Sequence, residues 1–292
     1  MRRFALAICV VAAVRLSADD GEQAALLATV LQKAGERVEH FFTRAQSIVC
    51  LEVVTLQPLN SGMTNQGFGR IVESELRLSW QPGDDGRPAT EAQTLRQLLR
   101  VNGQTPRQND WKNCTTPEQT TQETQDLSLL LPSQREEYRF EFRGETKIDG
   151  RAAIMIDYRL LKEATVESHL LEGRDDCISF DIDGGMRGRI WIDAATHDVL
   201  RLDQRLHGLV EIPLPRKTRL LPNDRPYWTM ERWDTSIRFR PMTFANPDET
   251  LVLPESRSSL QVTHGAGTPR LRTTTRYKNY QRFVTGGRVV GN

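Results

Sequence analysis

The sequence predicts a mainly β, α+β fold: a large antiparallel sheet with one N-terminal amphipathic helix lying on it. Two observations support this fold class. Segments in which apolar and polar residues alternate recur along most of the chain at hairpin spacing, which is typical of strands with one buried face. Ahead of them lies a single segment with helical periodicity. One helix followed by many strands indicates a sheet that buries one face against the helix.

The helix is expected from Asp20 to about Gln46. Asp20 and Gln23 have the spacing of a capping box, which marks a helix start. Apolar residues then recur in steps of three and four and form one stripe: Leu27, Leu31, Ala34, Val38, Phe41 and Ala45. Such a helix serves either as a lid over a ligand cavity or as the element that closes one side of the core.

The clearest hairpin spans residues 189–203. Ile190 and Ile192 share one face of its first strand, and Leu200 and Leu202 share one face of its second. The preceding strands alternate in the same way, with Phe140, Ile154 and Ile156 at apolar positions. We therefore expect one continuous sheet face under the helix, lined by Ile154, Ile156, Ile190, Ile192, Leu200 and Leu202.

Further strands are expected along the rest of the chain, at residues 49–56, 67–80, 206–213, 228–239, 250–253, 258–264 and 270–280. Residues 95–101 are too few to distinguish a strand from a helical turn. Residues 105–125 are rich in Thr, Gln, Asn and Glu and read as a long polar loop. Residues 172–177 read as an acidic loop, whereas Leu127 to Leu131 form an apolar anchor.

The first residues have the layout of a secretory signal peptide. Met1-Arg2-Arg3 is followed by the apolar run from Phe4 to Val14 and by a cleavage site near Ala18. The run is too short to span a bilayer as a helix. We expect residues 1–18 to be removed and residues 19–292 to form a single β-rich domain that is periplasmic or secreted.

The charge balance excludes nucleic acid as a partner. The full chain has 39 basic and 38 acidic residues, and the signal peptide contains three arginines and no acid. The remaining domain is therefore close to neutral and has no electrostatic footprint for a polyanionic chain.

Three cysteines remain after processing: Cys50, Cys114 and Cys177. An oxidising compartment allows one disulfide and leaves one thiol. Cys50 begins a strand beside apolar neighbours and suits a buried position, whereas Cys114 and Cys177 lie in polar segments. We predict a Cys114–Cys177 disulfide with Cys50 free, and the alternative is that Cys50 pairs with either of the other two.

No catalytic motif is present in the sequence. The histidines lack paired metal-ligand spacing, and His197 suits a hairpin turn. Asp181-x-Asp183-Gly184 begins like a calcium loop but lacks the later ligands, so it is interpreted as a turn. We expect neither a metal nor a cofactor.

Residues 213–228 contain the most suggestive segment without a catalytic pattern. Arg216, Lys217 and Arg219 are followed by Leu220 and, further on, by Trp228. Basic residues beside apolar ones suit contact with an anionic membrane surface or with a partner. The alternative is a long connection between strands whose leucines pack into the core.

The hairpin residues Gly188-Arg189-Ile190-Trp191-Ile192-Asp193 and Val199-Leu200-Arg201-Leu202 resemble a signature of the LolA-like superfamily. Residues 147–156 and 274–280 resemble further motifs of its exported members. That superfamily includes periplasmic lipoprotein carriers and the lipoprotein-sensing domain of a sigma-factor regulator. The resemblance implies a half-barrel, that is, an open and strongly curved sheet with helices on its concave apolar face. Its members hold acyl chains there and do not catalyse a reaction.

Three classes of function follow. The first is an exported, non-enzymatic protein that binds a lipid or another apolar ligand in the half-barrel concavity. Phe140 and the six residues of the predicted sheet face are then the ligand-binding residues. The second is an envelope scaffold with a filled core, whose partner is an acylated protein or another envelope protein. The third, an extracytoplasmic hydrolase, has no motif in its favour.

Overall fold

The structure is a computed structural model, and it describes residues 5–44, 47–80, 91–117, 120–124, 126–215, 226–245 and 248–282. Within these ranges its helices are α1 (Ala5–Arg44), α2 (Gln108–Lys112), η1 (Ser128–Leu130) and η2 (Arg135–Glu137), the last two of 3-10 type. Its strands are β1 (Ser47–Pro58), β2 (Arg70–Ser79), β3 (Glu91–Val101), β4 (Thr120–Thr124), β5 (Tyr138–Ile148), β6 (Arg151–Leu160), β7 (Thr165–Leu171), β8 (Arg174–Asp183), β9 (Met186–Asp193), β10 (Val199–Leu206), β11 (Val210–Pro213), β12 (Tyr227–Ala245), β13 (Asp248–His264) and β14 (Arg270–Arg282).

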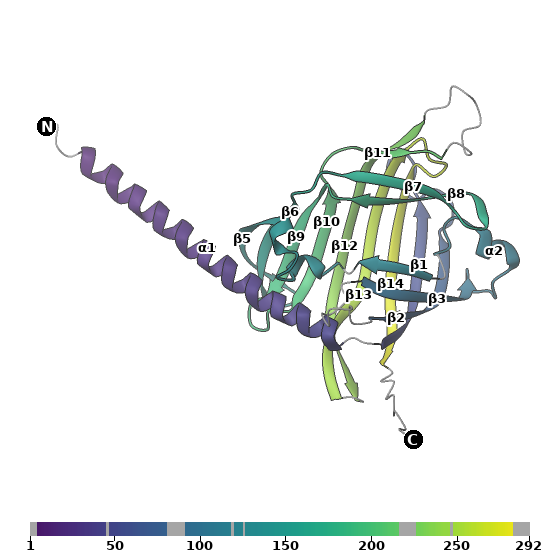
Figure 1. The fold of residues 1–292 in the computed structure, drawn as a ribbon, viewed down its shortest axis with the longest axis horizontal. Helices are drawn as coiled ribbons and strands as arrows, with labels where there is room; N and C mark the ends of the chain where they lie inside the picture. Colours follow the sequence, from purple (N-terminus) through teal and green to yellow (C-terminus); the bar gives the residue numbers. More distant parts are fainter. Residues whose placement is uncertain are drawn as a thin grey trace, which may run out of the picture.

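Twelve of these strands form one antiparallel sheet. Its order is β4-β3-β2-β1-β14-β13-β12-β10-β9-β6-β5, with β11 paired to β12, while β7 and β8 form a separate pair. The sheet does not close, because β4 and β5 are its two edges. Figure 1 shows the curved sheet with α1, α2 and the β7–β8 hairpin on one side of it. The predicted fold class, a large curved antiparallel sheet with one N-terminal helix, is confirmed.

The register of the strands defines two faces. Residues directly opposite each other in paired strands point to the same side. One such row runs through Ile156, Ile190, Leu202 and Ile237 on β6, β9, β10 and β12, and each of these residues is at most 2% exposed. We call the side to which this row points the inner face and the opposite side the outer face.

The helix α1 packs on the inner face. Its stripe shares one core cluster with the row above and consists of Val30, Leu31, Ala34, Val38, Phe41 and Phe42. The expected helix start at Asp20 is wrong, because α1 begins at Ala5. The residues between these positions include neither Gly nor Pro, so nothing local interrupts the helix there. In the described part of the chain, no helix is long and apolar enough to cross a membrane.

The polar segment at residues 105–125 is more ordered than the loop that was expected. It contains α2, and β4 pairs with β3. The sequence of β4 is Thr-Thr-Gln-Glu-Thr, which has no apolar alternation to reveal a strand. The interpretation of residues 95–101 is resolved in favour of a strand, since they belong to β3.

Two further expectations about loops and strands were wrong. Residues 172–177 do not form a loop, because β8 begins at Arg174 and Cys177 lies within it. Residues 206–213 are not one strand: β10 ends at Leu206 and β11 begins at Val210. Gly208 has a φ of 126° in the break between them, a conformation that favours glycine.

A buried carboxylate fixes the turn between β9 and β10. The Asp193 side chain accepts hydrogen bonds from the amides of Ala195 and Thr196, at 2.9 and 2.7 Å, and pairs with Arg151 at 2.8 Å. Burial acts to raise the pKa of Asp193, but the two amides and the guanidinium outweigh it and lower that pKa. His197 lies in the same turn with a φ of 61°, as the turn interpretation required.

We predict that Asp193→Ala lowers the free energy of unfolding by roughly 2–3 kcal/mol near pH 7, because it removes charged hydrogen bonds from a buried site. The folded-state pKa is depressed, so the contribution of Asp193 is fully present above the unfolded pKa of about 4 and is lost as the pH falls through the folded pKa. Urea unfolding from pH 7 to pH 3 measures this difference.

Asp181→Ala is the matched control, because Asp181 is exposed and has no ion pair among the described residues. Its effect should be small at every pH. A stability difference between wild type and Asp193→Ala that does not shrink on acidification contradicts the assignment.

Candidate ligand-binding face

Most of the predicted ligand-binding residues lie together on the inner face. Ile154, Ile156, Ile190, Ile192 and Leu202 belong to one cluster and are between 0% and 5% exposed. Phe140 is partly buried at the margin of that cluster. The structure thus brings together the sheet face that the alternation predicted, with one exception.

The exception is Leu200. The register between β9 and β10 shifts between Val199 and Arg201, which marks a bulge. Val199 stands opposite Ile192 and joins the core cluster, whereas Leu200 is buried but lies outside the cluster. Leu200 is the extra residue of the bulge and has no partner in the register, so its place on this face stays a prediction.

Two elements fill the inner face above these isoleucines. The stripe of α1 covers them from one side. The apolar anchor predicted from the sequence forms η1 and its flanks, and its buried leucines join the same cluster: Leu127, Leu129, Leu130 and Leu131. At this end of the sheet the concavity is occupied by side chains of the protein itself.

Arg135 fastens α1 to η1. Its Nη2 donates hydrogen bonds to the carbonyl oxygens of Leu31 in α1, at 2.9 Å, and of Leu130, at 3.1 Å. Burial lowers the pKa of this guanidinium. The close approach depends on Gly35, where an added Cβ would lie 2.5 Å from Arg135 Nη2 and 2.8 Å from the Leu130 oxygen. Sequence reasoning missed this contact, and the glycine inside a helical stripe was the available signal.

We predict that Gly35→Ala destabilises the domain by about 1–2 kcal/mol, because the methyl group overlaps a backbone oxygen in a packed contact. Alanine is otherwise the better helix former by about 1 kcal/mol. Gly21→Ala is the matched control within α1, because an added Cβ there meets nothing within 4 Å. Thermal unfolding of both variants measures the difference, and equal or stabilising effects of the two substitutions would exclude the proposed contact.

The centre of the inner face is polar. A row of opposed residues crosses β10, β12, β13 and β14 as Gln204, Thr235, Ser259 and Thr273. We call these four residues the hydroxyl row, in which Gln204 contributes an amide in place of a hydroxyl. It lies beside the row that contains Leu202 and Ile237, so a polar part of the inner face adjoins an apolar part. The concavity is therefore not uniformly apolar, contrary to what the resemblance implied.

A buried ion pair stands further along the inner face. Arg96 Nε donates to Glu52 Oε2 at 3.0 Å, and the two side chains are 11% and 5% exposed. Cys50 lies on the same strand as Glu52, and burial raises the pKa of its thiol to about 12. Cys50 is the free cysteine that was predicted, and it is protonated at neutral pH.

The β7–β8 hairpin, Thr165–Asp183, crosses in front of the inner face, and we call it the strap (Figure 1). It leaves the sheet after β6 and returns to it before β9 through Gly184 and Gly185. The Gly185 amide donates to the Lys162 oxygen at 2.8 Å, and an added Cβ on Gly184 would lie 2.1 Å from the Glu163 oxygen. Only glycine fits where the two ends of the strap cross.

The near half of the strap packs on the sheet. Val166, Phe180 and Ile182 contact a second buried cluster formed by Leu206, Val210, Ile212 and Met230. The ring centroids of Phe180 and Trp233 lie 6.1 Å apart, edge to face. Trp228, which was predicted as a membrane or partner contact, is partly buried and packs against this cluster. Arg216, Lys217, Arg219 and Leu220 lie outside the described residues.

The far half of the strap is fixed by a covalent bond. Cys177 of β8 forms a disulfide with Cys114, which follows α2, with the Cα atoms 5.2 Å apart. The predicted pairing is confirmed. Arg174 adds hydrogen bonds to the carbonyl oxygens of Thr116, at 2.6 Å, and Asn113, at 3.3 Å.

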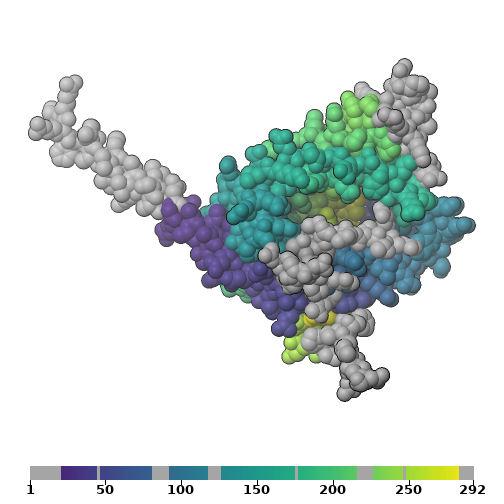
Figure 2. All heavy atoms as spheres, viewed as in Figure 1, coloured from purple at the N-terminus to yellow at the C-terminus, as the bar shows by residue number. Residues whose placement is uncertain are grey.

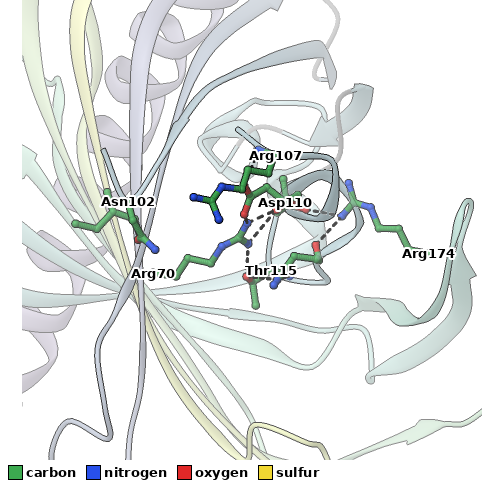
Figure 3. Close-up of polar contacts among 9 residues, drawn as sticks. Arg70, Asn102, Arg107, Asp110, Thr115 and Arg174 are labelled. Atoms are coloured by element: carbon green, nitrogen blue, oxygen red, sulfur yellow. Dashed lines mark hydrogen bonds and ion pairs between the residues drawn. The ribbon is translucent and has the colours of Figure 1, made fainter. Parts of the chain in front are cut away.

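Figure 3 shows how the segment around Cys114 is in turn held to the sheet. Arg70 of β2 donates to the hydroxyls of Thr115 and Thr116, at 2.8 and 2.9 Å, and pairs with Asp110 at 3.3 Å. Asp110 also accepts the amide hydrogen of Arg107 at 2.8 Å. The strap is therefore fastened at both ends, and Figure 2 shows a hollow beneath it with the yellow-green C-terminal strands at its floor.

The described residues contain no group of three or more His, Cys, Asp and Glu side chains arranged to hold a metal ion. Asp183, part of the motif interpreted as a turn, ends β8 and pairs with Lys162.

The chain was also compared with known proteins. No protein-family model matches it, and no curated protein matches it. Solved structures do. A DUF1329 family protein from Desulfovibrio piger is 12% identical with a TM-score of 0.44, covering 88% of this chain and 93% of that one. A putative outer membrane lipoprotein-sorting protein domain from Vibrio parahaemolyticus is 12% identical with a TM-score of 0.37, covering 88% and 92%. A LolA superfamily protein from Nitrosomonas europaea is 7% identical with a TM-score of 0.32, covering 87% and 94%.

The architecture is a half-barrel. The open, curved antiparallel sheet with a helix on its inner face is the one that the sequence motifs implied. At these identities and TM-scores, the likeness to the solved structures carries no argument about a ligand or a role.

Proposed function

We propose that the protein is an exported, non-enzymatic binding protein that holds a lipid, or another ligand with an apolar chain, on the inner face beneath the strap. The observation that carries this proposal is the strap itself. It is anchored at its root by glycines and an apolar cluster and at its far end by a disulfide, and a hollow lies beneath it. Because the strap is fastened at both ends, the hollow beneath it is bounded by parts of the chain that are held in place.

The floor of this space suits an amphiphile better than a purely apolar molecule. The hydroxyl row offers hydrogen-bond partners for a polar head. The aromatic and aliphatic side chains between strap and sheet, with Phe180 and Trp233 among them, offer an apolar surface for a chain. Binding sites with mostly apolar linings and a few placed polar groups are typical for small ligands.

The predicted ligand-binding residues have a more limited part in this proposal. Phe140 is partly buried at the margin of the core, so part of its side chain is open to a ligand. Ile154, Ile156, Ile190, Ile192 and Leu202 lie under α1, so a ligand contacts them only after α1 has moved away. We therefore place the ligand under the strap first.

Export is part of the proposal. A disulfide persists in an oxidising compartment outside the cytoplasm. Cleavage near Ala18 leaves the packing of α1 intact, because Val30 is the first buried residue of the helix among those whose side chains are described. Native mass spectrometry of protein isolated from its own envelope should show a co-purifying lipid mass and a chain that begins near Asp19.

We predict that Thr273→Trp weakens the binding of a fluorescent fatty acid at least tenfold, about 1.4 kcal/mol, by filling the floor beneath the strap. Thr274→Trp is the matched control, since the neighbouring residue on β14 points to the outer face. Titration of both variants and of wild type measures the effect. Saturable binding that is equally affected by both substitutions contradicts the inner-face site.

An envelope scaffold is the second candidate. The filled core under α1 favours it. So do the edge strands β4 and β5, which pair on one side only within the described sheet and are able to add a strand from an acylated protein or another envelope protein. The absence of both a co-purifying lipid and saturable fatty-acid binding would favour this candidate.

Contact of Arg216, Lys217, Arg219 and Leu220 with a membrane stays a prediction, to be tested by charge reversal and binding to anionic vesicles.

A further inference from the structure

The outer face of the sheet contains a hollow of about 900 Å³, formed across the strands from β5 to β14. Nine arginine side chains but only four carboxylates line it. The chain as a whole is nearly balanced, with 39 basic and 38 acidic residues. The hollow therefore concentrates positive charge that the protein as a whole does not have.

Four of these arginines stand directly opposite one another. Arg139 on β5 is opposed to Arg159 on β6, Arg159 to Arg187 on β9, and Arg187 to Arg205 on β10. We call them the arginine row. Neighbouring strands lie about 4.8 Å apart, so the row places four like charges at close and regular spacing. Like charges directly opposite each other destabilise a sheet.

Within the described strands, the row ends against a carboxylate, because Asp234 on β12 stands opposite Arg205. Among the described residues, none of the four forms an ion pair or a side-chain hydrogen bond, and Arg187 has a buried Nε without a partner. The four carboxylates of the hollow pair with other arginines. Glu141 pairs with Arg143, and Asp157 with Arg143 and Arg189. Asp203 pairs with Arg201, and Asp234 with Arg232.

An aromatic platform adjoins the row. Trp191 lies on β9 and also lines the hollow. The guanidinium of Arg201 lies 4.6 Å from its ring centroid, and Arg201 is held in turn by Asp203 at 2.7 Å. These contacts fix one side of the hollow, whereas the arginine row is left free to bind.

We propose that the arginine row binds a small ligand that carries two or more phosphate groups. The planar guanidinium group matches phosphate oxygens with paired hydrogen bonds, and adjacent guanidinium groups at strand spacing suit adjacent phosphates. The partly buried Arg187 lines a hollow, where a small ligand reaches it and a flat membrane surface does not. The site lies on the outer face, so it does not depend on the function proposed for the inner face.

The test uses the full-length mature protein and inorganic tripolyphosphate as the probe. Isothermal titration at low salt should show saturable binding. The double variant Arg159→Gln/Arg187→Gln should weaken it at least tenfold, or about one log unit in Kd, because both central guanidinium groups are lost. Arg276→Gln/Lys278→Gln is the matched control, since it removes two exposed positive charges from β14 outside the hollow and should change binding less than about twofold.

A second readout separates a binding site from general attraction of anions. Without ligand, Arg159→Gln/Arg187→Gln should raise Tm by roughly 2–4 °C, because like-charge repulsion is relieved. Tripolyphosphate should raise the Tm of wild type and of the control, but not of this variant. Arg139→Gln/Arg205→Gln is a second variant that removes the ends of the row and should weaken binding in the same direction.

Three results would overturn the proposal. One is the absence of saturable tripolyphosphate binding to wild type. Another is an equal loss of binding in the row variants and in the control, which would show attraction by net charge only. The third is binding to vesicles of anionic lipid that depends on the row while tripolyphosphate does not compete, which would assign the face to a membrane.

Discussion

The register of β5, β6, β9 and β10 is the constraint on which both faces of the protein depend. Side chains alternate strictly between the faces of a strand, so a slip by one residue exchanges the faces. Such a slip would bury the arginine row under α1 and expose Ile156, Ile190 and Leu202. An unpaired buried charge costs several kcal/mol, so the apolar core excludes the alternative register. The packed core on one side therefore also fixes the alignment of charges on the other.

The disulfide connects elements that the sheet leaves separate. Cys114 and Cys177 are 63 residues apart, and the chain between them includes η1, β5, β6 and the near end of the strap. Closing a loop of this length removes about 4 kcal/mol of unfolded-chain entropy in the simplest treatment. Arg135, which fastens α1, lies inside the same closed loop. The closed loop therefore contains most of the strap and the arginine that hydrogen-bonds to α1, while α1 itself lies outside the loop.

The fold could be predicted from the sequence to the extent that alternation and periodicity express burial. The stripe of α1, the isoleucines of β6 and β9 and the leucines of the apolar anchor all follow from which residues avoid water. The disulfide could be predicted because two cysteines lay in polar segments and one beside apolar residues. Features determined by backbone geometry could not. The bulge at Leu200, the crossing at Gly184 and Gly185, and the strand β4 made of Thr, Gln and Glu leave no apolar pattern in the sequence.

The candidate sites were harder to predict than the fold, because the sequence of one strand does not reveal which strands pair with it or in what register. The hydroxyl row arises only when β10, β12, β13 and β14 are placed side by side, and the arginine row only when β5, β6, β9 and β10 are. Each arginine alone reads as an ordinary exposed residue of a half-buried strand. The two faces then differ in whether packing within the protein accounts for their residues. The inner isoleucines are already covered by α1, so the fold itself accounts for them.

The arginine row has no such account within the described residues. Four opposed like charges lower the stability of the sheet, and the packing of the core on the other face offsets this loss. Proteins accept local destabilisation of this kind where a group serves binding rather than folding. The packed core on the inner face stabilises the sheet, and this stability offsets the repulsion within the arginine row on the outer face.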